Sequence, residues 1–284
     1  MSTESNKSTE NSFLIDVEKL DALDELFYNS AIYHSSQKYF DLLQFINKFP
    51  KLSPYNAYLV QMQNSGVTVV NTPAQWRKLG RYVKYQARPL VILVPFGPVQ
   101  FVYDIADTEG EPLPEYFISP FATVGYLDRD RYHRTIDNAN KVGLDVKEYD
   151  MHKNSAGYAE YINNKFSVSL NSTFSLNDKF STLIHELAHI FCGHLGVDYN
   201  SWWQYRKGLE KSIREIEAES ISYLVCNRIG LETTSDQYLS SYIQDHQKLP
   251  NISFNSILLV SGYIEQMGSK TFKPKKRKSS ENNL

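Results

Sequence analysis

The segment from Asp178 to Leu195 limits the possible folds of this 284-residue chain more than any other. Apolar residues recur along it at helical spacing, and the run His-Glu-Leu-Ala-His at 185–189 places two histidines four residues apart. Positions i and i+4 of a helix share one face and lie about 6 Å apart along the axis. The sequence therefore predicts one continuous helix over 178–195 that presents His185 and His189 side by side.

Two imidazoles in this arrangement can bind one Zn²⁺ with bonds of about 2.0–2.1 Å, while Glu186 is placed to reach a metal-bound water rather than the metal. The pattern alone is not decisive, because in a chain with seven histidines it arises by chance in roughly one sequence in a hundred. The alternative is a pair of ordinary helix histidines with Glu186 on a solvated face. The apolar neighbours argue against it, since unpaired polar groups are costly to bury among them: Leu183, Ile184, Leu187, Ala188, Ile190 and Phe191.

A catalytic zinc site takes a third protein ligand and keeps one position open. Residues 212–230 predict a second amphipathic helix that presents Glu215 and Glu219 on one face and turns Glu217 aside. Glu215 is the predicted third ligand, and Glu219 can hydrogen-bond the free ring nitrogen of a ligand histidine. His194 is the rival third ligand, but on a helix that continues to residue 195 it points away from the other two histidines.

Together these groups predict the hydrolysis of a peptide bond. Zinc lowers the pKa of a bound water towards 7, polarises the carbonyl and stabilises the developing oxyanion. Glu186 takes the proton of the water and passes it to the leaving amine. The expected substrate is a protein or peptide.

The order of the predicted elements indicates an α+β protein. We expect a polar leader, a first domain of helices followed by a β-hairpin, a connecting segment, a second domain with a small sheet and the histidine helix, and a basic tail. These segments are residues 1–12, 13–130, 131–150, 151–268 and 269–284.

Within these segments, turn residues and period-two patterns locate the strands. The first domain is expected to be helical up to about residue 64 and to contain a loop at Asp107–Pro114. The second domain is expected to start its histidine helix just after Ser175. The predicted strand pairs are Leu90–Pro95 with Val99–Ile105, joined at Phe96-Gly97-Pro98, and Gly157–Ile162 with Lys165–Asn171, joined at Asn163-Asn164.

Composition excludes several classes of protein. The formal charge of −2, from 30 basic and 32 acidic residues, argues against nucleic-acid binding through overall charge. The leader lacks the apolar core of a secretory signal, and the longest apolar stretch, Pro89–Tyr103, is too short and too interrupted for a membrane span. We therefore expect a cytoplasmic protein that makes no membrane contact, with Cys192 and Cys226 reduced and buried.

A local nucleic-acid site is the alternative function that the sequence leaves open. Basic residues around Trp76, Tyr82 and Tyr85 can supply phosphate contacts and stacking platforms for a single strand. In the other interpretation, the aromatic residues pack into the core while the charges face water. The basic residues concerned are Arg77, Lys78, Arg81, Lys84 and Arg88.

Over about 110 residues the second half resembles the ImmA/IrrE-type zinc metallopeptidases. The segments that carry this resemblance are Phe166–Asn171, Phe180–His194 and Glu215–Val225. The resemblance implies a zincin-like domain in which a strand precedes the zinc helix. It also implies that the third zinc ligand is a glutamate in a motif that falls on Glu215 to Glu219 here.

The first half resembles, over about 70 residues, the N-terminal domain of ArdC-type antirestriction proteins, which implies binding of single-stranded DNA. The segments concerned are Leu52–Leu59, Trp76–Lys84 and Ala87–Pro95. The sequence thus predicts a zinc-dependent endopeptidase that acts on a protein partner. The alternative is a single-stranded nucleic-acid-binding antirestriction or accessory protein whose zinc site is structural or only weakly active.

Overall fold

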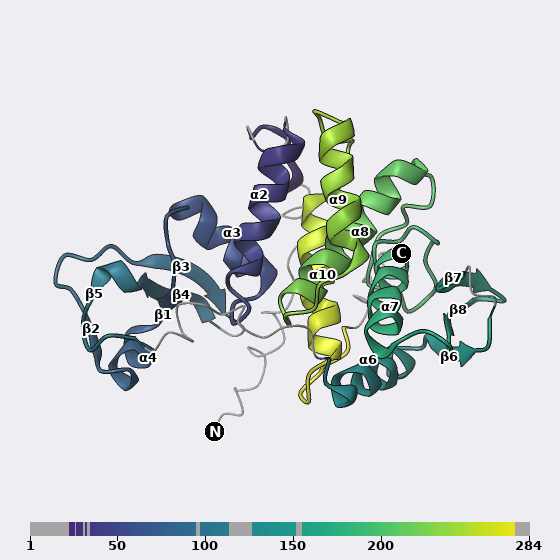
Figure 1. Ribbon diagram of the computed structural model, residues 1–284, viewed down its shortest axis with the longest axis horizontal. Coiled ribbons are helices and arrows are strands. Elements are labelled where there is room, and N and C mark those ends of the chain that lie inside the picture. Colours follow the sequence, from purple (N-terminus) through teal and green to yellow (C-terminus); the bar gives the residue numbers. More distant parts are fainter. Residues whose placement is uncertain are drawn as a thin grey trace, which may run out of the picture.

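The computed structural model of the chain describes residues 23–25, 27–30, 32, 35–94, 97–113, 127–151 and 155–275. The predicted leader, residues 13–22, residues 95–96 of the first hairpin turn and the tail beyond residue 275 lie outside the described residues. Helices occupy the middle of the molecule and two groups of strands lie at its opposite ends (Figure 1). The predicted α+β class is confirmed.

The described helices include those predicted before residue 64, the histidine helix and the helix of Glu215, together with helices that were not predicted, such as the two within residues 234–267. In chain order they are α2 (Ser36–Asn47), α3 (Pro54–Gln63), α4 (Pro73–Lys78), a short 3-10 turn (Ile105–Asp107), α6 (Arg129–Lys141), α7 (Leu176–Phe191), α8 (Lys211–Asn227), α9 (Thr234–Asp245) and α10 (Phe254–Met267). The strands are β1 (Val70–Asn71), β2 (Arg81–Val83), β3 (Leu90–Val94), β4 (Gly97–Asp104), β5 (Thr108–Gly110), β6 (Asp145–Tyr149), β7 (Gly157–Ile162) and β8 (Lys165–Asn171).

The first group of strands contains the predicted hairpin. β3 and β4 pair antiparallel, and β1 joins the other side of β4, so that β3 is an edge strand of this sheet. Its open edge is covered by side chains of α3. The Asn56 side-chain amide donates to Leu93 O and accepts from Leu93 N–H. The Gln63 amide makes the same pair of hydrogen bonds with Val91, and all four distances are 2.8–2.9 Å. These contacts fix the sheet against α3.

The predicted loop at 107–114 was wrong at its start. Residues 108–110 form β5, which pairs antiparallel with β2. The Arg81 side chain stabilises this pair by donating to the Thr108 hydroxyl and carbonyl at 2.8 and 3.1 Å. Asp104 caps the preceding 3-10 turn through Ala106 N–H at 3.1 Å. A three-residue strand is too short to show the alternation that identifies strands in a sequence.

The second sheet has the order β6-β8-β7, with β6 parallel and β7 antiparallel to the central β8. The predicted turn between β7 and β8 is confirmed, because Asn163 and Asn164 have φ values of +53° and +59°, which suit a two-residue hairpin turn. β7 lies close to α7 at Gly157, where an added β-carbon would lie 2.8 Å from Thr182 Cγ2.

The apolar core lies between α7, α8 and α10, and α2 and α3 pack onto the same helices. The buried guanidinium of Arg228, at the end of α8, donates to the carbonyls of Ile46 and Phe49 at 2.8 and 3.1 Å and also contacts Leu52 O. It thereby caps the C-terminal end of α2 and pairs with Glu265 of α10 at 2.5 Å. Early and late helices thus share one core.

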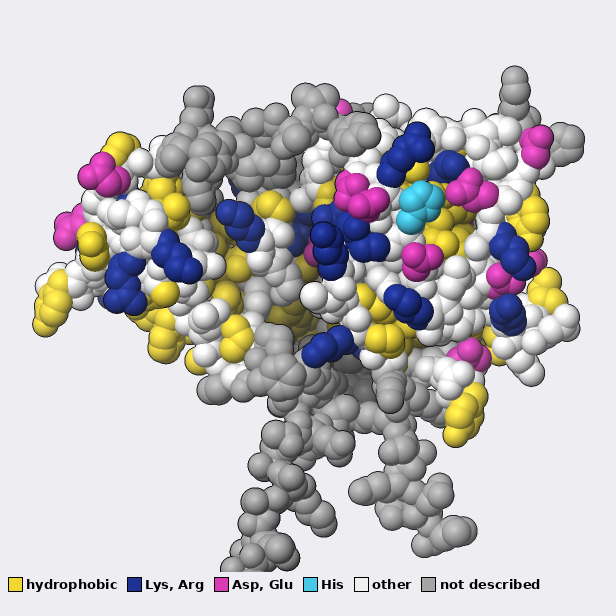
Figure 2. Space-filling view, turned by 90° about the horizontal axis from the view of Figure 1, so that it is seen from below, with side chains coloured by type: hydrophobic (Ala, Val, Ile, Leu, Met, Phe, Trp, Pro, Cys, Tyr) yellow, Lys and Arg dark blue, Asp and Glu magenta, His cyan; other side chains and the backbone are white. Residues whose placement is uncertain are grey.

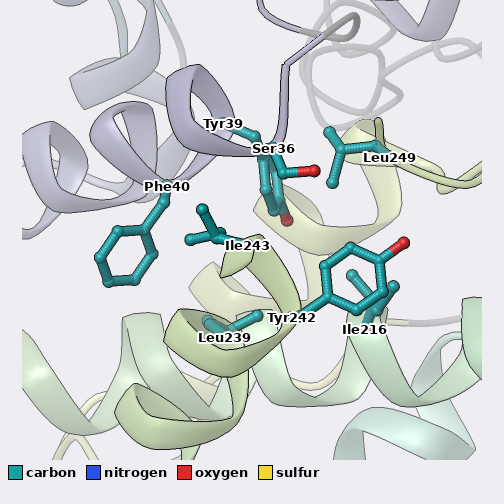
Figure 3. A pocket seen from close by; sticks show the side chains of 8 residues that line it. All are labelled: Ser36, Tyr39, Phe40, Ile216, Leu239, Tyr242, Ile243 and Leu249. Carbon is teal, nitrogen blue, oxygen red and sulfur yellow. The ribbon is translucent and has the colours of Figure 1, made fainter. Parts of the chain in front are cut away.

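Between α2, α8 and α9 lies a small pocket of about 10 Å³ (Figure 3). Its lining is mostly apolar, and its volume is close to the smallest that can hold one water molecule. It is therefore a packing defect rather than a ligand site. The lining residues are Ser36, Tyr39, Phe40, Ile216, Leu239, Tyr242, Ile243 and Leu249.

Several other sequence predictions can be compared with the structure. Cys192 and Cys226 are free and buried, as predicted. No described helix is long and apolar enough to cross a membrane. The start of the expected basic tail is packed: Phe272 lies against the core, and Lys275 Nζ lies 4.1 Å from the ring centroid of Trp202.

Candidate metal centre

The predicted histidine helix forms and is buried along one face. α7 begins after Ser175, whose hydroxyl accepts from the Asp178 N–H at 3.2 Å. Leu183, Ile184 and Leu187 are fully buried. The opposite side of the helix carries His185, Glu186 and His189, each only partly buried. An apolar face thus anchors the helix while the polar face stays accessible.

The helix ends earlier than predicted, at Phe191 rather than Leu195. Gly193 adopts a φ of +73°, which stops a helix, and the chain turns back so that His194 N–H donates to His189 O at 3.0 Å. His194 was predicted to point well away from the ligand face, but for this reason its Nδ1 lies 2.9 Å from His189 Nδ1, behind a predicted ligand. A glycine just past a periodic segment is a known stop signal and could have placed the helix end correctly.

α7 and α8 bring the three predicted metal ligands together. His185 Nε2 and His189 Nε2 lie 3.1 Å apart, and Glu215 Oε2 lies 3.6 Å from the first and 3.7 Å from the second. A point about 2.0 Å from all three atoms exists inside such a triangle, and this is the length of a zinc–nitrogen or zinc–oxygen bond. The donor set therefore fits one small divalent ion without any movement of the backbone.

The other acidic residues of α8 lie around the two histidines. Glu219 Oε1 is 3.5 Å from His185 Nδ1, on the side of the ring away from the ligand cluster. Glu217 is fully buried and contacts His194 Nε2 at 2.8 Å, and His194 Nδ1 lies 2.9 Å from His189 Nδ1. The sequence did not indicate these last contacts, nor the two hydrogen bonds that Arg206 makes to Glu217 at 2.6 and 2.7 Å.

The histidines and carboxylates of this cluster stabilise each other's charged forms. Burial alone would lower the pKa of His185, but its contact with Glu215 and the charges of Glu219, Glu186 and Glu215 outweigh burial and raise it. The same contacts from His185 and His189 lower the pKa of Glu215 far below its usual range. Glu215 is therefore an ionised carboxylate, as a metal ligand must be.

Glu186 lies in a different environment. Burial raises its pKa, and the charges of His185 and His189, together with a hydrogen bond from the Ala159 backbone, only partly oppose this effect. Ala159 belongs to β7, an edge strand of the second sheet. A carboxylate that accepts a proton more readily than usual thus lies between the ligand cluster and the edge strand β7.

Only some of the residues predicted to bind nucleic acid have exposed side chains. Trp76 is fully buried and donates from Nε1 to Tyr103 O at 2.9 Å, so it packs into the core as the second interpretation expected. Arg81 holds β5, and Lys84 Nζ donates to Ala106 O at 2.9 Å. The side chains that remain exposed are Arg77, Lys78, Lys84, Arg88, Tyr82 and Tyr85. Figure 2 shows one face of the molecule, on which basic side chains lie among acidic and apolar ones.

Comparison with known proteins gives limited similarity. No family model and no curated protein matches the chain, so membership of the ImmA/IrrE-type peptidases stays a prediction. Among solved structures, the metal-free antirestriction protein ArdC of plasmid R388 is 17% identical, with a TM-score of 0.42 over 78% of this chain and 86% of that one. Its Mn(II)-bound structure is 13% identical, with a TM-score of 0.39 over 91% and 99%. TM-scores this low do not establish a shared fold.

Proposed function

We propose that this protein is a zinc-dependent hydrolase that cleaves a peptide bond in a protein substrate. The observation that carries the proposal is the convergence of His185 Nε2, His189 Nε2 and Glu215 Oε2 within 3.1–3.7 Å of one another, with Glu186 beside them. Two imidazoles and one carboxylate form a donor set that zinc prefers, and three protein ligands leave room for water or substrate.

The residues of the chain divide the chemistry between them. His185, His189 and Glu215 would hold the ion, which would supply Lewis acidity and lower the pKa of a water molecule. Glu186 accepts the proton of the attacking water at its carboxylate, for which its raised pKa suits it. It then returns this proton to the leaving nitrogen. The N–H of Ala159 orients the Glu186 carboxylate through a hydrogen bond.

The neighbouring strand supports a peptide as the substrate. β7 pairs only with β8 among the described strands, so its other edge pairs with no described strand. An extended peptide can pair with such an edge through main-chain hydrogen bonds. Because Ala159 also contacts Glu186, a peptide on this edge passes directly beside the proton acceptor.

Metal analysis tests the site itself. We expect about one zinc per chain in protein purified without chelator. Glu215→Ala should lose most of this zinc, whereas Glu219→Ala, which removes the carboxylate behind His185 rather than a ligand, should weaken zinc binding less. A wild-type protein that binds no zinc even when zinc is added would overturn the proposal. Manganese in parallel samples shows whether the site prefers zinc.

Glu186→Gln separates catalysis from metal binding. This variant should bind zinc like the wild type but lose peptide cleavage by a factor of 10² or more, as expected when a general base is removed. A mixture of unstructured protein substrates, with products located by mass spectrometry, serves as the assay. Equal cleavage by wild type and Glu186→Gln would contradict the assigned role.

A second candidate function is the binding of single-stranded nucleic acid by the first half of the chain. The exposed side chains of Tyr82 and Tyr85, close in sequence to Lys84 and Arg88, favour it. We expect Tyr85→Ala to weaken salt-dependent binding of an oligonucleotide, whereas Trp76→Phe, at a buried residue, should leave it unchanged. Absence of binding by the wild type at low salt would exclude this candidate.

A further inference from the structure

Behind His189, on the side away from the ligand cluster, lies a buried series of polar side chains. His189 Nδ1 contacts His194 Nδ1 at 2.9 Å, and His194 Nε2 contacts Glu217 Oε2 at 2.8 Å. Arg206 donates to both Glu217 oxygens at 2.7 and 2.6 Å, and Ser253 N–H donates to Oε1 at 2.6 Å. His194 and Glu217 are completely buried.

The order of these contacts determines where the protons lie. Glu217 is an ionised carboxylate that forms a bidentate ion pair with the Arg206 guanidinium, so it can only accept hydrogen bonds. His194 must therefore donate from Nε2, which leaves Nδ1 of a neutral His194 as an acceptor. That acceptor requires His189 to carry its proton on Nδ1. In a neutral His189, Nε2 is then unprotonated, in the state that a metal ligand needs.

The same assignment satisfies the rest of the cluster. An unprotonated His189 Nε2 can accept from His185 Nε2–H at 3.1 Å. His185 then carries a proton on both ring nitrogens. It can direct Nδ1–H towards Glu219, 3.5 Å away, and must release the Nε2 proton to take a metal. Each predicted ligand histidine thus has a carboxylate of α8 behind it, which Glu219 supplies directly and Glu217 supplies through His194.

These contacts exclude two other roles for the same residues. Both ring nitrogens of His194 are already engaged, so it is not a free metal ligand. Cys192, His194 and Glu217 lie close enough to one another to be considered as a second metal cluster. Arg206 and Ser253 N–H, however, already occupy Glu217, and a cation would have to displace the guanidinium. The arrangement is complete without an ion.

We propose that Glu217, acting through His194, is a positioning residue that holds His189 in the Nδ1–H tautomer and in the orientation that presents Nε2 to the metal. This inference rests on the proposed metal site. Carboxylates behind metal-binding histidines commonly change metal affinity by a factor of 10–100 when removed. Here the effect is transmitted through one intervening histidine, with Arg206 fixing the carboxylate.

The tautomer can be measured on the metal-free wild type, so the first test needs no variant. Protein labelled with ¹⁵N-histidine gives ring-nitrogen chemical shifts that distinguish Nδ1–H from Nε2–H. We expect His189 to be the Nδ1–H form, with coupling to a neutral His194 protonated on Nε2. The Nε2–H form of His189 in the folded wild type would overturn the proposal.

Zinc affinity, measured by competition with a chromogenic chelator, gives the second test. Glu217→Gln and His194→Phe should each weaken zinc binding 10–100-fold and alter the visible spectrum of the Co²⁺-substituted protein. Glu265→Gln is the matched control, because it neutralises another carboxylate that pairs with an arginine, Arg228, away from the site. The control should keep wild-type affinity and spectrum.

The outcomes separate this inference from the proposed function. Wild-type affinity in both Glu217→Gln and His194→Phe would overturn the positioning role and leave the metal site standing. Equal weakening in the Glu265→Gln control would overturn it too, because the effect would then reflect lost stability. Failure of the wild type to bind zinc would overturn the proposed function, and the positioning role with it, whatever the tautomer.

Discussion

A β-carbon added to Gly193 would lie 1.9 Å from the carbonyl oxygen of Gln204. The loop segment that contains Gln204 crosses directly over the end of α7, and Arg206 N–H donates to Gly193 O at 3.0 Å. Any side chain at residue 193 would push this segment outward. The close approach thus places Arg206 where it reaches Glu217.

We therefore expect Gly193→Ala to destabilise the protein by about 3 kcal/mol or more, through a positive φ and a steric clash together. Gly143→Ala is the matched control, since Gly143 has a φ of +93° but no atom within 4 Å of an added β-carbon. It should cost only about 1 kcal/mol. Urea unfolding of both variants gives the comparison, and equal losses would contradict the clash.

Removal of the Arg228 guanidinium should separate α2 from the end of α8. Arg228→Met leaves the carbonyls of Ile46 and Phe49 without their donor and Glu265 without its partner, so we expect a loss of about 3–5 kcal/mol. Burial already raises the pKa of Glu265, and the lone carboxyl would take up a proton. Adding Glu265→Gln to Arg228→Met should therefore recover part of the loss in unfolding free energy. No recovery would contradict this account.

The amide pairs that cover the β3 edge give a third prediction. Gln63→Glu replaces the donor to Val91 O with an oxygen that repels it, so we expect a loss of about 1–2 kcal/mol. Gln63→Ala should cost about 1 kcal/mol and leave the edge open to water. Thermal unfolding measures both effects. If the two variants are equally stable, the introduced carboxylate does not repel Val91 O; if Gln63→Ala is as stable as the wild type, the amide contributes nothing at this edge.

Lowering the pH should reduce the stability of the fold because Glu217 becomes protonated. Burial raises the pKa of this carboxyl, but hydrogen bonds from His194 and Arg206 outweigh burial and hold it below its usual value. A lowered native pKa stabilises the fold above the unfolded-state pKa, and this stability is lost as pH falls through the native value. In chelator-treated protein near pH 7, Glu217→Gln should therefore have a free energy of unfolding about 3 kcal/mol lower than that of the wild type. This difference in unfolding free energy should become smaller below about pH 4. A difference in unfolding free energy that does not change with pH would contradict the assignment of Glu217 as an ionised carboxylate in the folded protein.

The sequence predicted the parts of the site that depend on spacing within one element. The two histidines of α7 and the pair Glu215 and Glu219 of α8 follow from helical periodicity, and the Asn163-Asn164 turn follows from residue chemistry. The role of Glu217 could not be predicted in this way. It depends on where α7 ends and on how the following loop returns Arg206, which are tertiary facts.

The short elements were missed for a different reason. β5 has three residues and is specified by the Arg81 side chain rather than by its own pattern. The packing of Trp76 was one of two open interpretations, because an amphipathic segment with aromatic residues suits either a core or a binding surface. Burial and the hydrogen bond to Tyr103 O decided between them.

The aromatic contacts of Phe254 with residues early in the sequence affect how the chain folds during translation. The ring of Phe254 in α10 lies 4.6 Å from that of Phe27, 6.2 Å from that of Tyr39 and 5.1 Å from that of Tyr58, measured between centroids. Phe27, Tyr39 and Tyr58 therefore lack this partner until α10 has been synthesised. Contacts so distant in sequence slow folding, and the early helices must remain protected from aggregation until α10 arrives.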